Sequence, residues 1–270
     1  MFTKIRHVAI YTENYDRMAK FYQTVFGMKK ITTGMTDETG NYNPNRGHIS
    51  DGVIGFALLQ RQPGIQAGLD HFGLEVEDVQ TVLDRLERNY PDSMVARSPS
   101  HVPFAGLRTH DPTGNHFDLS QKGMANVREG YTQEGWDQPR WLHHIAIRAS
   151  KPALLAQFYQ EVYEISPVEN LSDKDSFYLT DGRVCLAIRP WDMVSYRGLR
   201  EGLDHIGFKV ERLENVRKDL EEIAVSFPGS APRKIAIGRE GATRQKNLEA
   251  CKMGAYATSD PDGVLIDLSD

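Results

Sequence analysis

Hydrophobic positions along the chain follow two spacings, and the same succession of spacings occurs twice. Apolar strand patterns begin at RHVAIYT (residues 6–12) and at HHIAIRA (residues 143–149). Each is followed by a stretch in which apolar residues recur every three or four positions, NYDRMAKFYQTVFGM and KPALLAQFYQEVYEI, and this is the period of an amphipathic helix. Both helical stretches contain the tripeptide FYQ. The pattern therefore predicts a strand followed by a helix in each half.

A second repeated pattern lies further along each half. GLDHFGLEVED (68–78) and GLDHIGFKVER (202–212) both place a histidine at the head of an apolar run, and a helical pattern follows each of them. The halves close with HDPTGNHFDLSQ and SDPDGVLIDLSD, in which a DPxG turn precedes a strand that ends in Asp-Leu-Ser. Asp-Gly in ISDGVIGFALLQ and LTDGRVCLAIRP indicates a hairpin turn before a buried strand. The chain thus consists of four units of one strand, one helix and several further strands.

The spacing of equivalent residues supports this division. His7 and His144 are 137 positions apart, and His71 and His205 are 134 apart. From the second histidine to the aspartate of the closing Asp-Leu-Ser there are 47 positions in the first half and 62 in the second. The fourth unit therefore holds an insertion, which we interpret as a loop, around IAIGREGATRQKNLEACKMG. We predict a first domain, a linker of little periodicity and a second domain, at residues 1–121, 122–140 and 141–270.

Composition restricts the partners and the compartment. A net charge of −5 without long basic blocks argues against a nucleic-acid partner. The chain has no apolar run long enough for a membrane span and no signal-peptide pattern at its start. Cys185 and Cys251 are too few for a disulfide framework or a CxxC metal site. We therefore expect a cytoplasmic protein with no membrane partner.

Four units with these motifs in this order resemble the vicinal oxygen chelate superfamily. That group includes glyoxalase I, bleomycin and fosfomycin resistance proteins, and type I extradiol ring-cleaving dioxygenases. The resemblance covers nearly the whole chain outside the linker. It implies an α+β fold in which four βαβββ modules form two cupped mixed β-sheets with helices outside. The two-domain length and the ending AIGREG…Y…DPDGVLIDL are most similar to the extradiol dioxygenases.

The resemblance also implies a divalent metal held by two histidines and one carboxylate in each cup. Carried over position by position, the candidate ligands are His7, His71 and Asp118 in the first half and His144, His205 and Asp267 in the second. The family carboxylate is usually glutamate, and both positions here hold the shorter aspartate. Such a triad binds Fe(II), with Mn, Ni, Zn or Co as alternatives, and leaves positions open for a substrate with two neighbouring oxygens.

Two alternatives stay open for these residues. A histidine at the start of a strand can simply cap a sheet edge, and duplication would copy it into both halves. The modules can also pair in two ways. If units one and two share a sheet, each triad comes from one half of the chain, as given above. Pairing of the first unit with the last would instead join His7 to His205 and Asp267.

Further candidates come from the inserted segment and the strand after it. Tyr256 lies eleven residues before Asp267, and in extradiol enzymes a tyrosine ten before the carboxylate touches the substrate oxygens. It is therefore the candidate catalytic residue, although the offset of one position can turn it out of the cup. Arg239 and Arg244 can meet an anionic substrate or lie on a solvated loop. Related dioxygenases often have a histidine where this chain has Glu240.

The leading functional prediction is a metal-dependent extradiol-type dioxygenase that opens the ring of a catechol- or hydroquinone-like substrate. The first alternative is a glyoxalase-like lyase or isomerase, although the strand GFALLQ offers no glutamate as its base. The second is a bleomycin-resistance-like protein that binds a ligand without chemistry. In each case the partner is a small molecule, and whether the chain forms a homo-oligomer stays open. The longer insertion predicts that the working site is the one with the final strand.

Overall fold

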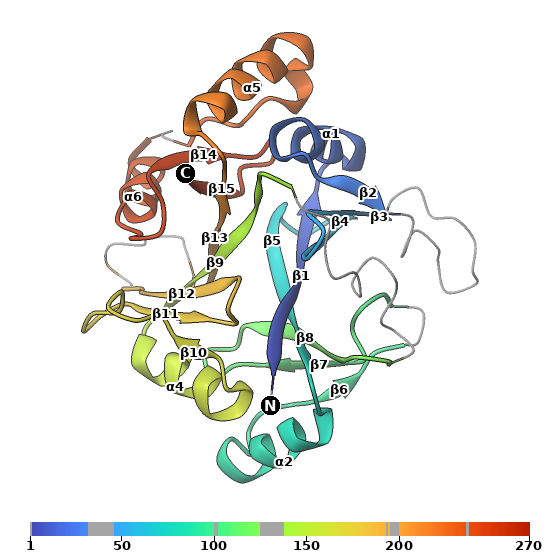
Figure 1. Ribbon diagram of the computed structural model, residues 1–270, viewed down its shortest axis with the longest axis vertical. Coiled ribbons are helices and arrows are strands. Elements are labelled where there is room, and N and C mark those ends of the chain that lie inside the picture. The colour runs from blue at the N-terminus through green and yellow to red at the C-terminus, as the bar shows by residue number, and fades with distance from the viewer. Residues whose placement is uncertain are drawn as a thin grey trace.

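The computed structural model confirms the α+β fold with two mixed sheets, of eight and seven strands (Figure 1). Neither sheet closes into a barrel among the described residues. No helix in the described part of the chain is long and apolar enough to cross a membrane. The structure describes residues 2–31, 46–99, 102–124, 138–192, 194, 200–235 and 238–270.

The first sheet has the strand order β2-β3-β4-β1-β5-β8-β7-β6. At its centre β1 runs antiparallel to β5, and each of these strands is parallel to its outer neighbour, β4 or β8. The strands are β1 Thr3–Thr12, β2 Lys29–Ile31, β3 Arg46–Ser50, β4 Gly55–Gln60, β5 Gly68–Val76, β6 Ala96–Arg97, β7 Leu107–His110 and β8 His116–Gln121.

The second sheet repeats this plan with the order β10-β11-β12-β9-β13-β15-β14. Its central pair is β9 with β13, flanked by the parallel strands β12 and β15. Units one and two therefore share one sheet and units three and four the other, so the pairing is sequential. The strands are β9 Trp141–Ala149, β10 Ser166–Pro167, β11 Phe177–Thr180, β12 Cys185–Pro190, β13 Gly202–Lys209, β14 Tyr256–Ser259 and β15 Leu265–Ser269.

The helices lie at the periphery, and two pairs of them join the halves at opposite ends of the molecule (Figure 1). α1 packs against α5 at one end and α2 against α4 at the other. The insertion, interpreted from the sequence as a loop, forms the additional helix α6. The described helices are α1 Tyr15–Phe26, α2 Val79–Asn89, α4 Pro152–Tyr163, α5 Leu213–Ser226 and α6 Gly238–Glu249, with a short 3₁₀ helix η1 at Pro228–Ser230.

The two halves share one hydrophobic core between the sheets. The ring of Phe26 on α1 stacks on Phe208 of β13, with their centroids 3.9 Å apart. Along β1 the core side chains Val8 and Ile10 alternate with His7, whose side chain lies on the opposite face. The alternation of each central strand thus places apolar residues in the shared core and the candidate ligands in the cups.

The FYQ and DPxG motifs are connected across the halves. The Tyr22 hydroxyl donates to Asp260 Oδ2 at 3.1 Å, and the Tyr159 hydroxyl donates to Asp111 Oδ2 at 3.0 Å. Each tyrosine belongs to FYQ in one half, and each aspartate opens the DPxG turn of the other half. Because all four groups are buried, each hydrogen bond satisfies a donor and an acceptor that would otherwise be costly to bury. Two equivalent tyrosine–aspartate hydrogen bonds, one from each copy of the motifs, therefore connect the two halves.

Candidate functional site

The Leu-Asp-His sequence in both copies of the repeat forms a β-bulge. The ladder between β1 and β5 skips Asp70, and that between β9 and β13 skips Asp204. The extra residue bends the strand, so that the aspartate and the following histidine lie close together. Asp70 Oδ2 is 2.6 Å from His71 Nδ1, and Asp204 Oδ2 is 2.6 Å from His205 Nδ1. Each aspartate therefore orients its histidine and leaves Nε2 facing the cup.

The glycine two residues after each of these histidines is explained by sterics, because a larger residue there would clash with neighbouring side chains. Gly73 lies opposite His7 and Gly207 lies opposite His144 in the central ladders. A Cβ atom on Gly207 would stand 1.9 Å from Cε1 of the His144 ring, and one on Gly73 would stand 2.3 Å from Cε1 of Phe104 and 2.9 Å from Cβ of His7. The repeated motif GLDHxG thus supplies a candidate ligand histidine, the carboxylate that orients it, and space for the histidine on the neighbouring strand.

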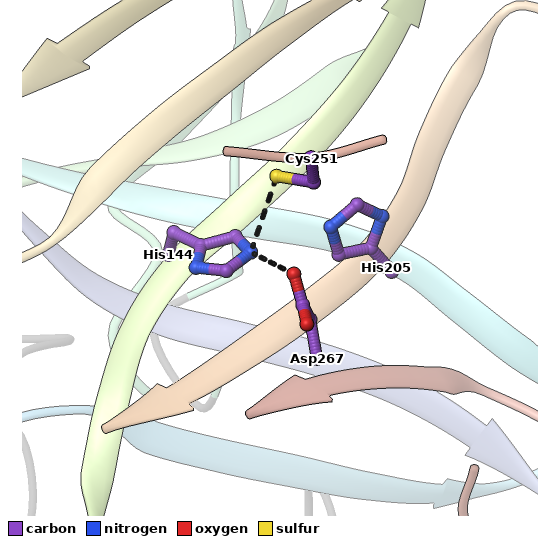
Figure 2. A group of neighbouring side chains, drawn as sticks. All are labelled: His144, His205, Cys251 and Asp267. Carbon is purple, nitrogen blue, oxygen red and sulfur yellow. Dashed lines mark hydrogen bonds and ion pairs between the residues drawn. The ribbon is translucent and has the colours of Figure 1, made fainter. Parts of the chain in front are cut away.

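In the second half, the structure brings together His144, His205 and Asp267, and adds Cys251 (Figure 2). The donor atoms of the four residues all lie within 4.8 Å of one another. His144 Nε2 is 3.8 Å from Asp267 Oδ2 and 3.9 Å from Cys251 Sγ. The first three residues come from β9, β13 and β15, and Cys251 comes from the turn after α6. None of the four is more than 3% exposed, so the group is closed off from bulk solvent.

This buried group leaves polar atoms without hydrogen bonds, as a cation site would. His205 Nε2 and Asp267 Oδ2 both lack a hydrogen-bond partner. Burying such atoms unpaired costs ~1–3 kcal/mol each, and a bound cation would remove that cost. Burial raises the pKa of the Asp267 carboxyl to about 6 and lowers the pKa of His144 well below its usual value. An unprotonated imidazole and a carboxylate oxygen are ligands that divalent ions accept, so the residues present fit a metal.

Asp204 controls the charge on His205 as well as its orientation. Burial lowers the pKa of His205, but its interactions with Asp204 and, to a smaller extent, Cys251 outweigh this, and the pKa rises to about 10. An incoming metal ion must therefore displace a proton from Nε2.

We expect Asp204→Asn to weaken divalent metal binding by about 10- to 100-fold, because the His205 ring loses the carboxylate that holds its Nε2 toward the ion. Titration against a competing chelator measures this effect. Asp70→Asn is the matched control in the first half and should leave the affinity of the second-half group unchanged. Equal affinities for the Asp204→Asn and wild-type proteins would contradict the role given to Asp204.

In the first half, His7, His71 and Asp118 also lie together, but they are bonded to one another. His71 Nε2 is 3.3 Å from His7 Nε2 and 3.1 Å from Asp118 Oδ2. Arg108 Nε donates to Asp118 Oδ1 at 2.9 Å, and the Phe104 ring stacks on His7 with centroids 5.3 Å apart. A protein cation thus bonds to this triad and an aromatic ring stacks on it, and the described polar atoms of the triad have hydrogen-bond partners without a metal.

Tyr256 does not join either group. It pairs with Leu268 in the β14–β15 ladder, whereas Ala257 pairs with Asp267. Its side chain packs against the shared core, and the Arg217 guanidinium lies 4.6 Å from its ring centroid. The spacing of eleven residues therefore turns Tyr256 away from the cup, because side chains on a strand alternate between its faces. The side chains of Arg239 and Glu240 lie outside the described residues.

A cavity of about 730 Å³ lies between the two halves, and its lining does not include the four residues of the second-half group. Asp204 forms part of its wall and links the cavity to His205. The basic side chains that line it are Arg61, Arg148, Arg233, Lys234 and Arg244.

Each acidic side chain of this cavity has a basic partner. Glu13 pairs with Arg61 at 2.5 Å, and Asp204 pairs with Arg148. Asp262 pairs with Arg17, which does not line the cavity. Among the described residues, Arg233, Lys234 and Arg244 thus have no carboxylate partner, and the Nε of Arg244 is buried without a hydrogen bond. The cavity therefore presents a surplus of positive charge.

Sequence reasoning missed Asp204 and Cys251. The first had a local signal, since Asp precedes His in both copies of the repeat. No sequence signal marked Cys251, because its approach to the candidate ligands depends on how the insertion folds back over the sheet.

Comparison with known proteins agrees with the repeat and the fold. Residues 4–119 match the family model of the Glyoxalase/Bleomycin resistance protein/Dioxygenase superfamily. The match lies within the first half of the chain and shows its similarity to that superfamily. The resemblance predicted from the repeated motifs is therefore confirmed, and the second half repeats the motifs and strand order of the first. No curated protein sequence matches the chain.

Solved structures of the superfamily match the fold of both halves. The Mn(II)-bound glyoxalase from Novosphingobium aromaticivorans is 16% identical, with a TM-score of 0.63 over 98% of this chain and 81% of that one. The 2,3-dioxygenase LapB from Pseudomonas sp. KL28 is 19% identical, with a TM-score of 0.63 over 98% and 91%. A variant of homoprotocatechuate 2,3-dioxygenase from B. fuscum is 15% identical, with a TM-score of 0.61 over 98% and 70%. At these identities the likeness establishes the shared fold.

Proposed function

We propose that this protein is a metal-dependent extradiol-type dioxygenase that cleaves the ring of a catechol- or hydroquinone-like substrate. The observation that carries the proposal is the second-half group, in which His144, His205 and Asp267 converge with unpaired buried donor atoms. When bound there, a divalent ion, Fe(II) in the first instance, supplies a Lewis acid that chelates two neighbouring oxygens and a site for O₂. Similar structures include 2,3-dioxygenases, which favours this chemistry over the alternatives.

The residues of the chain have separate roles in this proposal. His144, His205 and Asp267 hold the ion, and the carboxylate also balances part of its charge. Asp204 keeps the Nε2 of His205 directed at the ion. Burial of the group excludes bulk water, which strengthens each electrostatic interaction there.

The basic cavity favours a substrate that carries negative charge, for example a catechol with a carboxylate substituent. Arg233, Lys234 and Arg244 provide the surplus positive charge, and the volume suits a single aromatic ring with a side chain. An anion there would lie near Asp204, which is hydrogen-bonded to the proposed metal ligand His205.

For Arg244→Ala we expect KM for a carboxylate-substituted catechol to rise by about tenfold or more. The change removes a charge-assisted hydrogen bond of ~1.5–3 kcal/mol. KM for unsubstituted catechol, which lacks the anionic group, should stay close to the wild-type value. Steady-state oxygen uptake with both substrates measures the difference, and an equal change in both KM values would refute an anionic subsite at Arg244.

Metal analysis combined with oxygen uptake tests the proposed function. Protein loaded anaerobically with Fe(II) or Mn(II) should bind the ion and consume O₂ when a panel of catechols is added, with a ring-opened product. A protein that binds the ion and converts an oxygenated substrate without O₂ would instead be a glyoxalase-like lyase or isomerase. That second candidate is favoured only by the similarity to the Mn(II)-bound glyoxalase. Ligand binding without turnover would indicate a binding protein.

A further inference from the structure

The turn that follows α6 carries a cysteine into the second cup, and the shorter first half has no equivalent segment. Leu248, near the end of α6, is fully buried, and the Cys251 backbone N–H donates to the Leu248 carbonyl at 2.9 Å. This bond closes the turn in which the cysteine lies. Cys251 itself is only 3% exposed, and its sulfur lies beside His144 (Figure 2).

The position of this sulfur suits coordination to the same ion as the histidines. Metal–sulfur and metal–nitrogen bonds of ~2.3 and ~2.1 Å place two ligand atoms on one ion about 3–4 Å apart. Cys251 Sγ and His144 Nε2 are 3.9 Å apart, close to that range. The two unpaired atoms of the group, His205 Nε2 and Asp267 Oδ2, complete a set in which all donor atoms lie within 4.8 Å.

A structural role for Cys251 is the simpler alternative. The residue belongs to a small apolar cluster with Tyr178, Cys185 and Met253 on the cup side of the sheet, where a buried cysteine can act as a small hydrophobe. Cys185 fits that description, because it lies on β12 outside the donor group. Cys251 differs in that it reaches a cluster of metal-ligating side chains.

We propose that the Cys251 thiolate is a fourth protein ligand of the ion in the resting second-half site, and that it leaves when a diol chelates. This inference rests on the proposed function. Binding of the ion releases the thiol proton to solvent as the metal–sulfur bond forms. Four protein ligands leave two positions on a six-coordinate ion, and a chelating diol fills both. A position for O₂ therefore opens only if one protein ligand is released. Cys251, on a turn rather than a strand, fits this role: its metal–sulfur bond breaks, and the thiolate takes up a proton that the diol loses on chelation.

Cobalt substitution tests the proposal without depending on turnover. Apoprotein is loaded with Co(II) anaerobically, with a non-thiol reductant that keeps both cysteines reduced. A thiolate ligand gives a charge-transfer absorption in the near ultraviolet that nitrogen and oxygen ligands do not give. We expect this absorption in the wild type and in Cys185→Ser, which is the matched control. Cys251→Ser should bind Co(II) but lack the absorption, and adding catechol anaerobically to the wild type should diminish it.

The outcomes separate this inference from the proposed function. If wild-type protein binds no Co(II), the metal site and the proposed function both fail. If it binds Co(II) without the absorption, or if Cys251→Ser retains the absorption, the metal site stands and the cysteine ligand is refuted. An absorption that catechol leaves unchanged would show a permanent ligand and overturn the proposed release.

Discussion

Asp267→Ala is expected to abolish turnover, whereas Asp118→Ala should leave a measurable rate. Asp267 is the only carboxylate in the second-half group, so its loss removes a ligand and the charge that balances the ion. The loss of metal affinity should exceed the 10- to 100-fold reduction expected for a residue such as Asp204, which only hydrogen-bonds a ligand. Asp118 instead receives a hydrogen bond from Arg108 in a cup whose polar atoms are already satisfied.

Bound metal and initial rates of oxygen uptake, measured on both variants, decide between the halves. Asp118→Ala also removes a partner of Arg108 and of the buried His71, so thermal unfolding should show a loss of stability, and rates are compared on folded protein. Activity that survives in Asp267→Ala but is lost in Asp118→Ala would reverse the assignment and place the working site in the first half.

Gly207→Ala should remove most of the bound metal although it changes no ligand. The added methyl group would stand 1.9 Å from the His144 ring, which must turn out of the cup to make room. Overpacking of this kind also costs ~1–3 kcal/mol of folding stability. Metal content per chain and thermal unfolding measure the two effects separately.

Gly229→Ala provides the matched control, because a Cβ atom at that position meets nothing within 4 Å. It should keep wild-type metal content. If the Gly207→Ala protein is folded and binds metal as the wild type does, then His144 is not held in place by its cross-strand neighbour, and the steric explanation of the repeated glycine is wrong.

Some features of the candidate site were accessible from the sequence because they depend on local spacing. Strand alternation places His7 and Val8 on opposite faces, whatever the rest of the fold does. The duplication then provided an internal comparison, since residues such as His71 and His205 recur at nearly constant intervals. The class of fold and the two triads of ligand-type residues were then implied by the resemblance of this repeated pattern to the vicinal oxygen chelate superfamily.

The orientation of Tyr256 and the charge of the cavity were not accessible in this way. A single residue of offset decides whether Tyr256 faces the cup or the core, and the ladder with β15 sets that register. The cavity draws side chains such as Arg61 and Arg244 from opposite halves, and their proximity depends on how the two sheets pack.

The sequence by itself determined the four units, the apolar and polar faces of the central strands, and the residues that can bind a metal. Only the tertiary structure decided that the units pair sequentially, that bulges bring Asp70 and Asp204 onto their histidines, and that Cys251 reaches the second group. The physical reason is the range of the interactions. Periodicity is set by neighbouring residues, whereas strand register and the course of an insertion are set by contacts between segments far apart in the chain.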